Sequence, residues 1–383
     1  MTLSKHKQHC RACRGKLEAA PLLQYFDMPC AAQQFPLLED LSKDKGAELK
    51  IYQCTNCGLV QTPAPPVSYY REVIRAAAFS QEMHEFRKFQ FLQFVQNYQL
   101  AEKPVLEVGC GHGEYLSLLQ EANVHAHGIE YSASAVNTCR SAGLSVSRGF
   151  ISRPGQIIKT GPFSAFVTLN FMEHWPNPVA SLRGIHNNLV DEGIGLVEVP
   201  NLNMILDKGL YSEFISDHLS YFTIETLTYT LQSAGFAVLE CKSIWHNYIL
   251  SAVVKKRAMV DLRLLHRRQT EVAVALESFI RRFPTGSVAI WGAGHQALAT
   301  IALSGIGDHI KYVVDSAPFK QGRFTPATHL PIVPPDTLKT DPAKAVIIMA
   351  AAYSDEIYRI IRARYGQKIE VAILRDFGLE TRQ

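Results

Sequence analysis

The chain has 383 residues, of which 47% are hydrophobic and 19% are charged, and its formal net charge is +4. This length suggests two or three domains, and the composition excludes a disordered protein. The small charge does not indicate nucleic-acid binding, so we expect neither a nucleic-acid partner nor a membrane partner. The first residues contain no secretion signal and no apolar run reaches the roughly 18 residues of a membrane helix, so a cytoplasmic protein is expected.

Cysteine is concentrated near the start of the chain. Two C-x-x-C pairs, Cys10 with Cys13 and Cys54 with Cys57, have matching spacing. Each pair can present two thiolates to one cation, and two pairs complete the tetrahedral site of a structural zinc ion. The gap between the pairs is longer than the about 15–20 residues of a zinc ribbon, so a redox pair or separate buried thiols are the alternatives. Cys30 is expected to be an unliganded thiol.

The composition predicts three domains of α/β class. Residues 1–75 form the cysteine-rich lobe and end in the proline-rich stretch QTPAPPVSYY, which precludes a helix. In residues 76–253, strand-like runs alternate with helical stretches, which is typical of a doubly wound domain with a mostly parallel sheet. Residues 254–383 begin with a helix predicted over 254–283, whose basic first half is expected to be solvated. A second, Rossmann-like unit follows it.

A helical pattern opens the second region at about residue 76. Its apolar side chains recur at helical spacing, which predicts one buried helix face. They are Met83, Phe86, Phe89 and Phe94. A buried-type strand, KPVLEVGC, comes next and leads into a glycine-rich turn.

This turn has the sequence EVGCGHG, from Glu107 to Gly113. Its glycines allow close approach of a ligand at a helix N-terminus, and Glu130, at the end of the next strand, can accept both hydroxyl groups of a ribose. An acidic residue ahead of the glycines would repel a pyrophosphate but suits a cation, so the pattern resembles the S-adenosylmethionine site of class I methyltransferases. A tight turn without a ligand is the alternative. The predicted cofactor-binding residues are Glu107, Gly109, Gly111, Gly113, Glu130, Tyr131, Asn170 and Phe171.

A second glycine-rich turn, Gly292 to Ala297, reads G-x-G-x-x-A after the strand VAIW, and Asp315 closes the next strand. This is a formal dinucleotide fingerprint. Three interpretations remain open: a site for NAD, an anchor for a nucleotide or phosphate of the substrate, and a turn required only by the fold.

Two histidines follow predicted strand ends, where ligands of a doubly wound sheet bind. His174 follows PFSAFVTLN, and His218 stands beside Asp217 in a later loop. A histidine next to a carboxylate near a methyl donor is a candidate general base, and a hydrogen-bonded loop residue is the alternative for each. Carbon methylation beside a ketone needs a base and a group that holds the enolate oxygen. We expect His218 to be the base and Asp217 to favour its imidazolium, while His174 or the hydroxyl group of Tyr70 holds the oxygen.

The order of these motifs resembles one family. The cysteine pairs precede EVGCGHG, EHWPNP, DHLSYF, WGAGHQ and the loop PFKQGRFTPATHLPIVPP. Over nearly the whole chain this succession is similar to the three-domain sugar C-methyltransferases, which act on nucleotide-activated 4-keto-deoxyhexoses. The resemblance implies a zinc lobe, a central domain for S-adenosylmethionine and a Rossmann-like C-terminal domain. It also implies His218 as the base, preceded by Asp217 where the family typically has Glu, and a matching His174.

Family members tend to carry a tyrosine and serine cluster before the central domain, and this chain reads IRAAAFSQ there. We expect a methyltransferase that acts on carbon of a small nucleotide-linked sugar. The alternatives are an O- or N-methyltransferase of another small metabolite, with or without a phosphate group, and an NAD-dependent oxidoreductase. A nucleic-acid modifier and a zinc-stabilised binding protein without catalytic activity are further classes.

Overall fold

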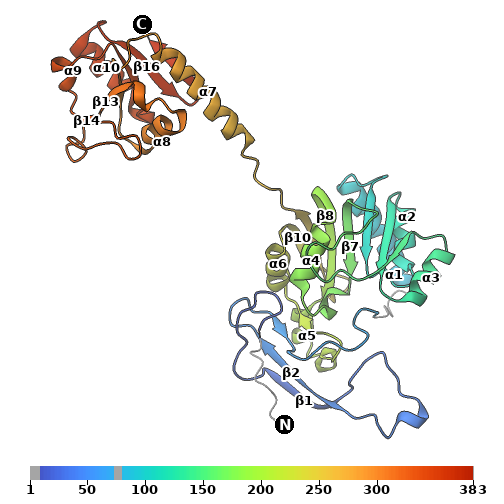
Figure 1. Ribbon diagram of the computed structural model, residues 1–383. Helices are drawn as coiled ribbons and strands as arrows, with labels where there is room; N and C mark the ends of the chain where they lie inside the picture. Colours follow the sequence, from blue (N-terminus) through green and yellow to red (C-terminus); the bar gives the residue numbers. More distant parts are fainter. Residues whose placement is uncertain (1–8, 73–79, 383) are drawn as a thin grey trace. The chain divides into compact units, whose positions relative to one another are not determined.

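The computed structural model describes residues 9–72 and 80–382 of the chain. The chain forms two compact units, Met1–Ala258 and Met259–Gln383 (Figure 1). The first unit contains the cysteine-rich lobe and the first α/β domain. The domain boundaries after residues 75 and 253 remain predictions, and most of the IRAAAFSQ stretch lies outside the described residues.

A small antiparallel sheet organises the lobe. Its strands, in the order β1-β2-β3-β9, are β1 (Leu23–Met28), β2 (Ala47–Gln53), β3 (Val60–Gln61) and β9 (Ser220–Tyr221). The turn η1 (Leu38–Asp40) lies between β1 and β2. The strand β9 comes from the α/β domain, where it begins just after His218, and it pairs Tyr221 with Val60. The lobe and the α/β domain therefore share one sheet beside a predicted catalytic residue.

A seven-stranded sheet forms the centre of the α/β domain. The strand order is β10-β11-β8-β7-β4-β5-β6, and only β11 runs antiparallel to its neighbours. The strands are β4 (Pro104–Val108), β5 (His125–Glu130), β6 (Val146–Arg148), β7 (Phe163–Leu169), β8 (Leu189–Pro200), β10 (Phe236–Ile244) and β11 (Ile249–Lys256). The mostly parallel sheet is confirmed. Because β4, β5 and β7 are parallel, their carboxyl ends share one edge, where the predicted site residues gather.

Helices cover both faces of this sheet (Figure 1). On one face lie α1 (Gln81–Asn97), α2 (Glu114–Glu121) and α3 (Ala133–Ser141). On the other face lie α4 (Pro178–His186) and α6 (Ile224–Ser233). The connections contain η3 (Met172–His174), α5 (Leu202–Asp207) and η4 (Tyr211–Glu213). Side-chain caps mark several helix starts: the side chains of Ser80, Asn177 and Thr223 accept backbone N–H groups of the first turn.

The buried face of α1 differs in part from the predicted one. Met83 and Phe94 are buried and Phe86 packs against the core, as predicted. Phe89, however, is 61% exposed, and Phe91 is fully buried. The buried positions of the helix follow intervals of three and four residues, a pattern that includes Phe91 and not Phe89.

A buried ion pair joins α1 to the sheet. The guanidinium group of Arg87, 1% exposed, pairs with the carboxylate of Glu198 on β8, which is 0% exposed. One oxygen of this carboxylate also accepts hydrogen bonds from Gln90 Nε2 over 2.5 Å and from Ser251 Oγ over 3.0 Å. The charge of Arg87 is thus compensated by a carboxylate that is itself fixed by polar neighbours.

We predict that Glu198→Gln lowers the free energy of unfolding by about 3–5 kcal/mol, because it leaves the charge of Arg87 buried without a counter-ion. Urea denaturation measures the loss. The double variant Arg87→Met/Glu198→Gln should recover part of it, since it buries no charge. Unchanged stability of Glu198→Gln would contradict the importance of this pair.

The second unit is built on a six-stranded sheet with the order β14-β13-β12-β15-β16-β17, parallel except for β17. The strands are β12 (Val288–Trp291), β13 (Ile310–Val314), β14 (Ile332–Val333), β15 (Ala345–Ile348), β16 (Glu370–Arg375) and β17 (Gly378–Arg382). The helices are α7 (Arg263–Ile280), α8 (His295–Ser304), α9 (Thr337–Thr340) and α10 (Ser354–Tyr365), with the turns η5 (Gly307–His309) and η6 (Ala351–Tyr353). Helices α7 and α8 pack on one face, and α9 and α10 pack on the other.

The helix predicted over 254–283 is shorter than expected. It begins at Arg263, because β11 continues to Lys256 as an inner strand of the sheet. Its first half is exposed, as predicted, whereas Leu276 and Phe279 in the second half are buried. None of the helices within the described ranges combines the length and the hydropathy that a bilayer span requires.

Candidate active site and cysteine cluster

The four predicted zinc ligands meet in the lobe. The Sγ atoms of Cys10, Cys13, Cys54 and Cys57 all lie within 4.8 Å of one another. The Sγ atoms are 3.5 Å apart in Cys10 and Cys57 and 3.4 Å apart in Cys13 and Cys54. Cys30 is exposed and does not belong to the cluster. The structure therefore brings together the four cysteines selected from the sequence and separates the fifth.

The surroundings of the cluster fit a four-coordinate metal ion. The backbone N–H of Gly15 donates to Sγ of Cys13 over 3.2 Å, and that of Asn56 donates to Sγ of Cys54 over 3.4 Å. Backbone donors of this kind orient sulfur atoms for binding to a metal ion. Four sulfur ligands leave no open position, so the site suits a structural ion rather than a catalytic one.

The turn after β4 requires glycine where it approaches other segments. Gly109 has a φ of +74°, and a Cβ there would lie 2.5 Å from Cδ1 of Phe171. Gly113 has a φ of +93°, and a Cβ there would lie 2.4 Å from Cδ1 of Leu144. A larger residue at either position would be strained and would clash. The glycines thus allow the turn to lie directly against the segment that follows β7 and against the connection between α3 and β6.

The carboxylate predicted to bind a ribose lies at this turn. Glu130 is 5% exposed, and its two oxygens accept backbone N–H bonds from Gly111 over 3.0 Å and from Ser132 over 2.8 Å. A carboxylate oxygen can accept more than one hydrogen bond, so an acceptor for ribose hydroxyl groups lies at this turn. Glu107 is fully buried in β4 below the turn.

Asn170 and Phe171 follow β7 at the same edge of the sheet. Asn170 has a φ of +47°, and its buried side-chain oxygen Oδ1 has no hydrogen-bond partner among the residues that the structure describes. A buried acceptor of this kind is available to a donor group of a ligand. The ring of Phe171 packs edge-on against Phe150 and Trp175, with centroids 6.0 and 5.7 Å away. The edge therefore offers an acceptor and an aromatic wall, which fits the predicted methyl donor.

Tyr131 belongs to an aromatic group around Arg71, a residue that the sequence analysis did not select. The guanidinium carbon of Arg71 lies 5.0, 5.1 and 5.5 Å from the ring centroids of Tyr70, Tyr131 and Phe150. Nε of Arg71 also donates to the hydroxyl oxygen of Tyr70 over 2.8 Å. Arg71, Tyr131 and Phe150 line a small space beside Gly109. These contacts place Tyr70 close to the predicted donor site.

The two predicted catalytic histidines meet near Phe171. The ring centroids of His174 and His218 are 4.9 Å apart, and that of Phe171 is 6.5 Å from His174. His174 is buried in η3, whereas His218 is half-buried. Nδ1 of His174 donates to the backbone carbonyl of Asp217 over 2.8 Å. Because a carbonyl can only accept, neutral His174 carries its proton on Nδ1 and has a lone pair on Nε2.

Burial lowers the pKa of both histidines. The pKa of His174 lies below its ordinary value because the buried imidazolium is poorly solvated. Burial also lowers the pKa of His218 well below its ordinary value, and the neighbouring His174 adds to this shift. Both rings are therefore neutral near pH 7, and the site contains unprotonated ring nitrogens that can accept a proton.

A carboxylate lies beside this pair. Oε1 of Glu173 is 3.9 Å from Nε2 of His174, and the ligand atoms of Glu173, His174 and His218 all lie within 4.8 Å of one another. Two imidazoles and one carboxylate at such distances suit proton transfer, and they are also a set that could hold a divalent cation. Metal analysis of His218→Ala distinguishes proton transfer from cation binding at these residues.

The carboxylate of Asp217 faces the lobe. Its Oδ1 accepts the backbone N–H of Ala32 over 2.9 Å, and its Oδ2 accepts the hydroxyl group of Tyr69 over 2.7 Å. Burial, together with this bond to Asp217, raises the pKa of Tyr69 to about 12, so the hydroxyl group keeps its proton. Within residues 9–72 and 80–382, no hydrogen bond joins this carboxylate to the ring of His218. The carboxylate of Asp217 thus contacts the lobe and not, as had been expected, the ring of His218. Its partner Tyr69 was not among the residues predicted from the sequence.

The second glycine-rich turn lies in the second unit, Met259–Gln383. Gly292 has a φ of +116°, and a Cβ there would lie 2.6 Å from the carbonyl oxygen of Met349. The carboxylate of Asp315 accepts the N–H groups of Ala293 and Ala317, each over 2.8 Å, and pairs with Lys320 over 2.9 Å. The carboxylate of Asp315 is thus bound by groups of the protein itself. These contacts favour a role of the turn in the fold over a ribose contact.

Comparison with known proteins agrees with these features. The model of a methyltransferase domain matches residues 79–241, and the model of a C-methyltransferase C-terminal domain matches residues 266–371. Over 384 residues the chain is 23% identical to C-methyltransferase NovU of Streptomyces niveus, an alignment that covers 91% of this chain and 90% of that protein. It is also 32% identical over 134 residues to the ubiquinone biosynthesis O-methyltransferase of Methylococcus capsulatus, which covers 33% of this chain and 56% of that protein.

Among solved structures, an S-adenosylmethionine-dependent methyltransferase from Clostridium acetobutylicum matches with a TM-score of 0.39 and 12% identity, covering 46% of this chain and 92% of that chain. The two matched domains follow the four-cysteine lobe in the predicted order. The chain therefore contains a methyltransferase domain followed by a C-methyltransferase C-terminal domain, and it is an S-adenosylmethionine-dependent methyltransferase.

Proposed function

We propose that this methyltransferase acts on a carbon atom of a nucleotide-linked keto-deoxysugar, with His218 as the general base. The observation that carries the proposal is the pair of neutral histidines at the carboxyl edge of the sheet. A carbon beside a ketone becomes a nucleophile only after it loses a proton, so a base is required there. Similarity over most of the chain to a C-methyltransferase supports carbon as the methylated atom.

The residues at the glycine-rich turn would hold the methyl donor. Glu130 would accept the ribose hydroxyl groups, and Oδ1 of Asn170 would accept a donor group of the ligand. When bound, S-adenosylmethionine supplies a methyl group that is already activated. The remaining tasks of the protein are to orient the acceptor and to remove its proton.

The hydrogen bonds divide these tasks between the residues. His218 is half-buried, so its ring can reach an acceptor. The single ring proton of neutral His174 is donated to the backbone carbonyl of Asp217. Neutral His174 therefore does not donate to an enolate oxygen. We therefore assign His174 to positioning the ring of His218, against which it packs. The hydroxyl oxygen of Tyr70 accepts a bond from Arg71, and its O–H group is the remaining candidate donor to the enolate oxygen.

Binding of the methyl donor is the first test. S-adenosylmethionine and its demethylated product, each at about 100 times its dissociation constant, should raise the free energy of unfolding by about 2.7 kcal/mol, whereas NAD should not. Glu130→Ala should remove the shift, because it removes the ribose acceptor. Glu121→Ala, on the exposed surface of α2, is the matched control. A shift with NAD alone, or none with either donor compound, would contradict the proposal.

The acceptor is tested with a panel of nucleotide-linked 4-keto-deoxyhexoses. Mass spectrometry and NMR should reveal a new methyl group on carbon, and the proton beside the ketone should exchange with D₂O when the methyl donor is omitted. An O-methyl product would instead favour the second candidate, an O-methyltransferase of a small metabolite. The 32% identity to an O-methyltransferase over 134 residues is the observation behind that candidate.

A further inference from the structure

We propose that Tyr69 is a positioning residue of the active site, which fixes the two histidines through Asp217. Tyr69 belongs to the cysteine-rich lobe and lies 148 residues before Asp217 in the chain. Its hydroxyl group donates to Oδ2 of this carboxylate over 2.7 Å. The inference deepens the proposed function and rests on it, because it explains how the proposed base, His218, is held.

The turn formed by residues 216 and 217 has little backbone support of its own. One end is fixed by Tyr221, whose hydroxyl group accepts the N–H of Ile215 over 3.0 Å and donates to its carbonyl over 3.2 Å. The other end is fixed by the N–H of Leu219, which donates to the carbonyl of Glu173 over 2.8 Å. In the part of the chain that the structure describes, the two residues between these ends form no backbone–backbone hydrogen bond. Their position therefore depends on their side chains.

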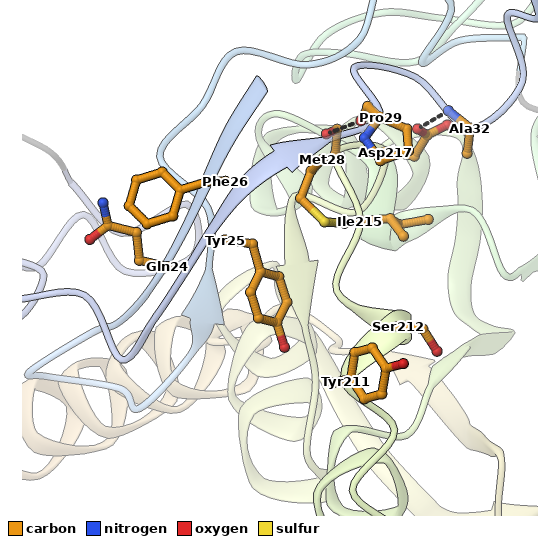
Figure 2. Close-up of a pocket in the computed structure, with 11 residues that line it drawn as sticks. Gln24, Tyr25, Phe26, Met28, Pro29, Ala32, Tyr211, Ser212, Ile215 and Asp217 are labelled. Atoms are coloured by element: carbon orange, nitrogen blue, oxygen red, sulfur yellow. Dashed lines mark hydrogen bonds between the residues drawn. The ribbon is translucent and has the colours of Figure 1, made fainter. Parts of the chain in front are cut away.

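Both side chains of the turn bind the lobe (Figure 2). Ser216 Oγ donates to the carbonyl of Pro29 over 2.9 Å. Oδ1 of Asp217 accepts the N–H of Ala32 over 2.9 Å. The two partners follow β1 in a segment that contains neither helix nor strand, so this segment needs a further contact to fix the turn firmly.

Tyr69 supplies this contact. Its hydroxyl oxygen accepts the N–H of Gln33, the residue after Ala32, over 3.0 Å, while its O–H group donates to Asp217. Asp217 is 2% exposed, and a buried carboxylate is costly unless donors satisfy its oxygens. Hydrogen bonds to a charged group are also stronger than those between neutral groups. Loss of this one hydroxyl group would thus loosen both the carboxylate and the lobe segment that binds it.

Direct contacts lead from Asp217 to the proposed base. The backbone carbonyl of Asp217 accepts the Nδ1–H of His174 over 2.8 Å, and this bond sets the orientation of the ring. The rings of His174 and His218 pack with their centroids 4.9 Å apart, and the ring of Tyr221 lies 6.0 Å from that of His218. Displacement of Asp217 would therefore be passed to His218 through packed rings. A misplacement of about 1 Å can lower a rate about 100-fold.

The first test removes one oxygen atom from the full-length protein. Tyr69→Phe should lower kcat about 10- to 100-fold with the panel of nucleotide-linked 4-keto-deoxyhexoses, because the base is misplaced. KM for the sugar and binding of S-adenosylmethionine should change less than about twofold, since Tyr69 is assigned no contact with either. Tyr25→Phe is the matched control: Tyr25 is another half-buried tyrosine of the lobe, and Figure 2 shows its ring directed away from Asp217. A native kcat, or a loss confined to KM, would overturn the proposal.

A double-variant experiment tests whether Tyr69 acts through Asp217. Asp217→Ala and Tyr69→Phe/Asp217→Ala should have kcat values within about twofold of each other, because the hydroxyl group has lost the carboxylate that it positions. A further loss of about tenfold or more in the double variant would show a separate route and contradict the proposal. Thermal unfolding with S-adenosylmethionine confirms that the compared variants are folded, and Tyr69→Phe decides the matter by itself if Asp217→Ala is not.

The third measurement requires no methyl acceptor. In NMR spectra of protein with isotope-labelled histidine, the Nδ1–H of His174 is identified by its absence from His174→Gln. Its exchange with solvent should be at least about tenfold faster in Tyr69→Phe than in Tyr25→Phe, because the carbonyl that binds it is less firmly held. Faster exchange in a protein that methylates no sugar would refute the proposed function and leave the role of Tyr69 at the histidines intact. Equal exchange together with native kcat on a methylated sugar would refute the positioning role alone.

Discussion

Replacement of His218 by alanine should lower kcat by at least about 100-fold while binding of S-adenosylmethionine stays unchanged. Loss of a general base typically costs about 10²–10⁴ in rate. The methyl donor contacts are predicted at the glycine-rich turn, at Glu130 and at Asn170, so removal of the imidazole leaves them in place. Methyl transfer measured with labelled donor gives kcat, and thermal shift gives donor binding.

His246→Ala is the matched control, because its side chain is 75% exposed. Turnover of His218→Ala within a few fold of the native rate would remove His218 from its proposed role. Metal analysis of the same variants distinguishes proton transfer from cation binding. If Glu173, His174 and His218 held a metal ion, His218→Ala would contain less metal than His246→Ala.

The pH dependence follows from the buried state of His218. A base acts in its deprotonated form, and burial lowers the pKa of His218 well below its ordinary value. The ring therefore stays neutral as the pH falls through about 6.5, the ordinary pKa of histidine. We expect kcat/KM to remain constant from pH 7.5 to 6.5 and to decline only at lower pH. A half-maximal rate at or above pH 6.5 would contradict this assignment.

Replacement of Cys10 by serine should release a bound zinc ion and unfold the lobe. Formation of a structural zinc site contributes about 10–16 kcal/mol in zinc-finger peptides, so the loss of one ligand is expected to exceed most single-residue effects. Cys10 is fully buried within the cluster. Because the lobe shares its sheet with β9, the damage should extend to the segment that carries His218 and lower the rate of methyl transfer.

Elemental analysis should find one zinc ion per native chain and less than one in Cys10→Ser, and thermal unfolding should show a lower midpoint. Cys30→Ser is the matched control, because Cys30 is an exposed thiol of the same lobe outside the cluster. Full zinc content together with native stability in Cys10→Ser would refute the four-cysteine site and revive the redox interpretation.

The motifs that the sequence located correctly are local ones. Cys10 with Cys13 and Cys54 with Cys57 each lie on one turn, so their spacing alone predicts that two sulfur atoms point to one place. The same holds for the turn at Gly109, where a positive φ and the close approach of Phe171 require glycine. The alternation of strands and helices likewise predicted the parallel sheet, because neighbouring elements along the chain pack together.

The predictions that changed depend on partners far away in the sequence. Asp217 is held by Ala32 and Tyr69, which lie 185 and 148 residues away, and no spacing rule encodes such pairs. The role that we propose for His174 differs from the expected one for the same reason, since Nδ1 of His174 donates to a carbonyl 43 residues away. The buried face of α1 also depended on packing, because the sequence offers more aromatic residues than one face can bury.

The class of protein, the pairing of the four clustered cysteines and the glycine-rich turn after β4 could be predicted from the sequence, since each depends on residues within one turn or one strand-turn-helix unit. The connections of His174, His218 and Asp217 could not be predicted in this way. They arise where the lobe and the α/β domain share β9 and the bonds of Ala32 and Tyr69. The physical reason is that hydrogen bonds and burial across this junction depend on the packing of the two domains, which the order of residues along the chain does not display.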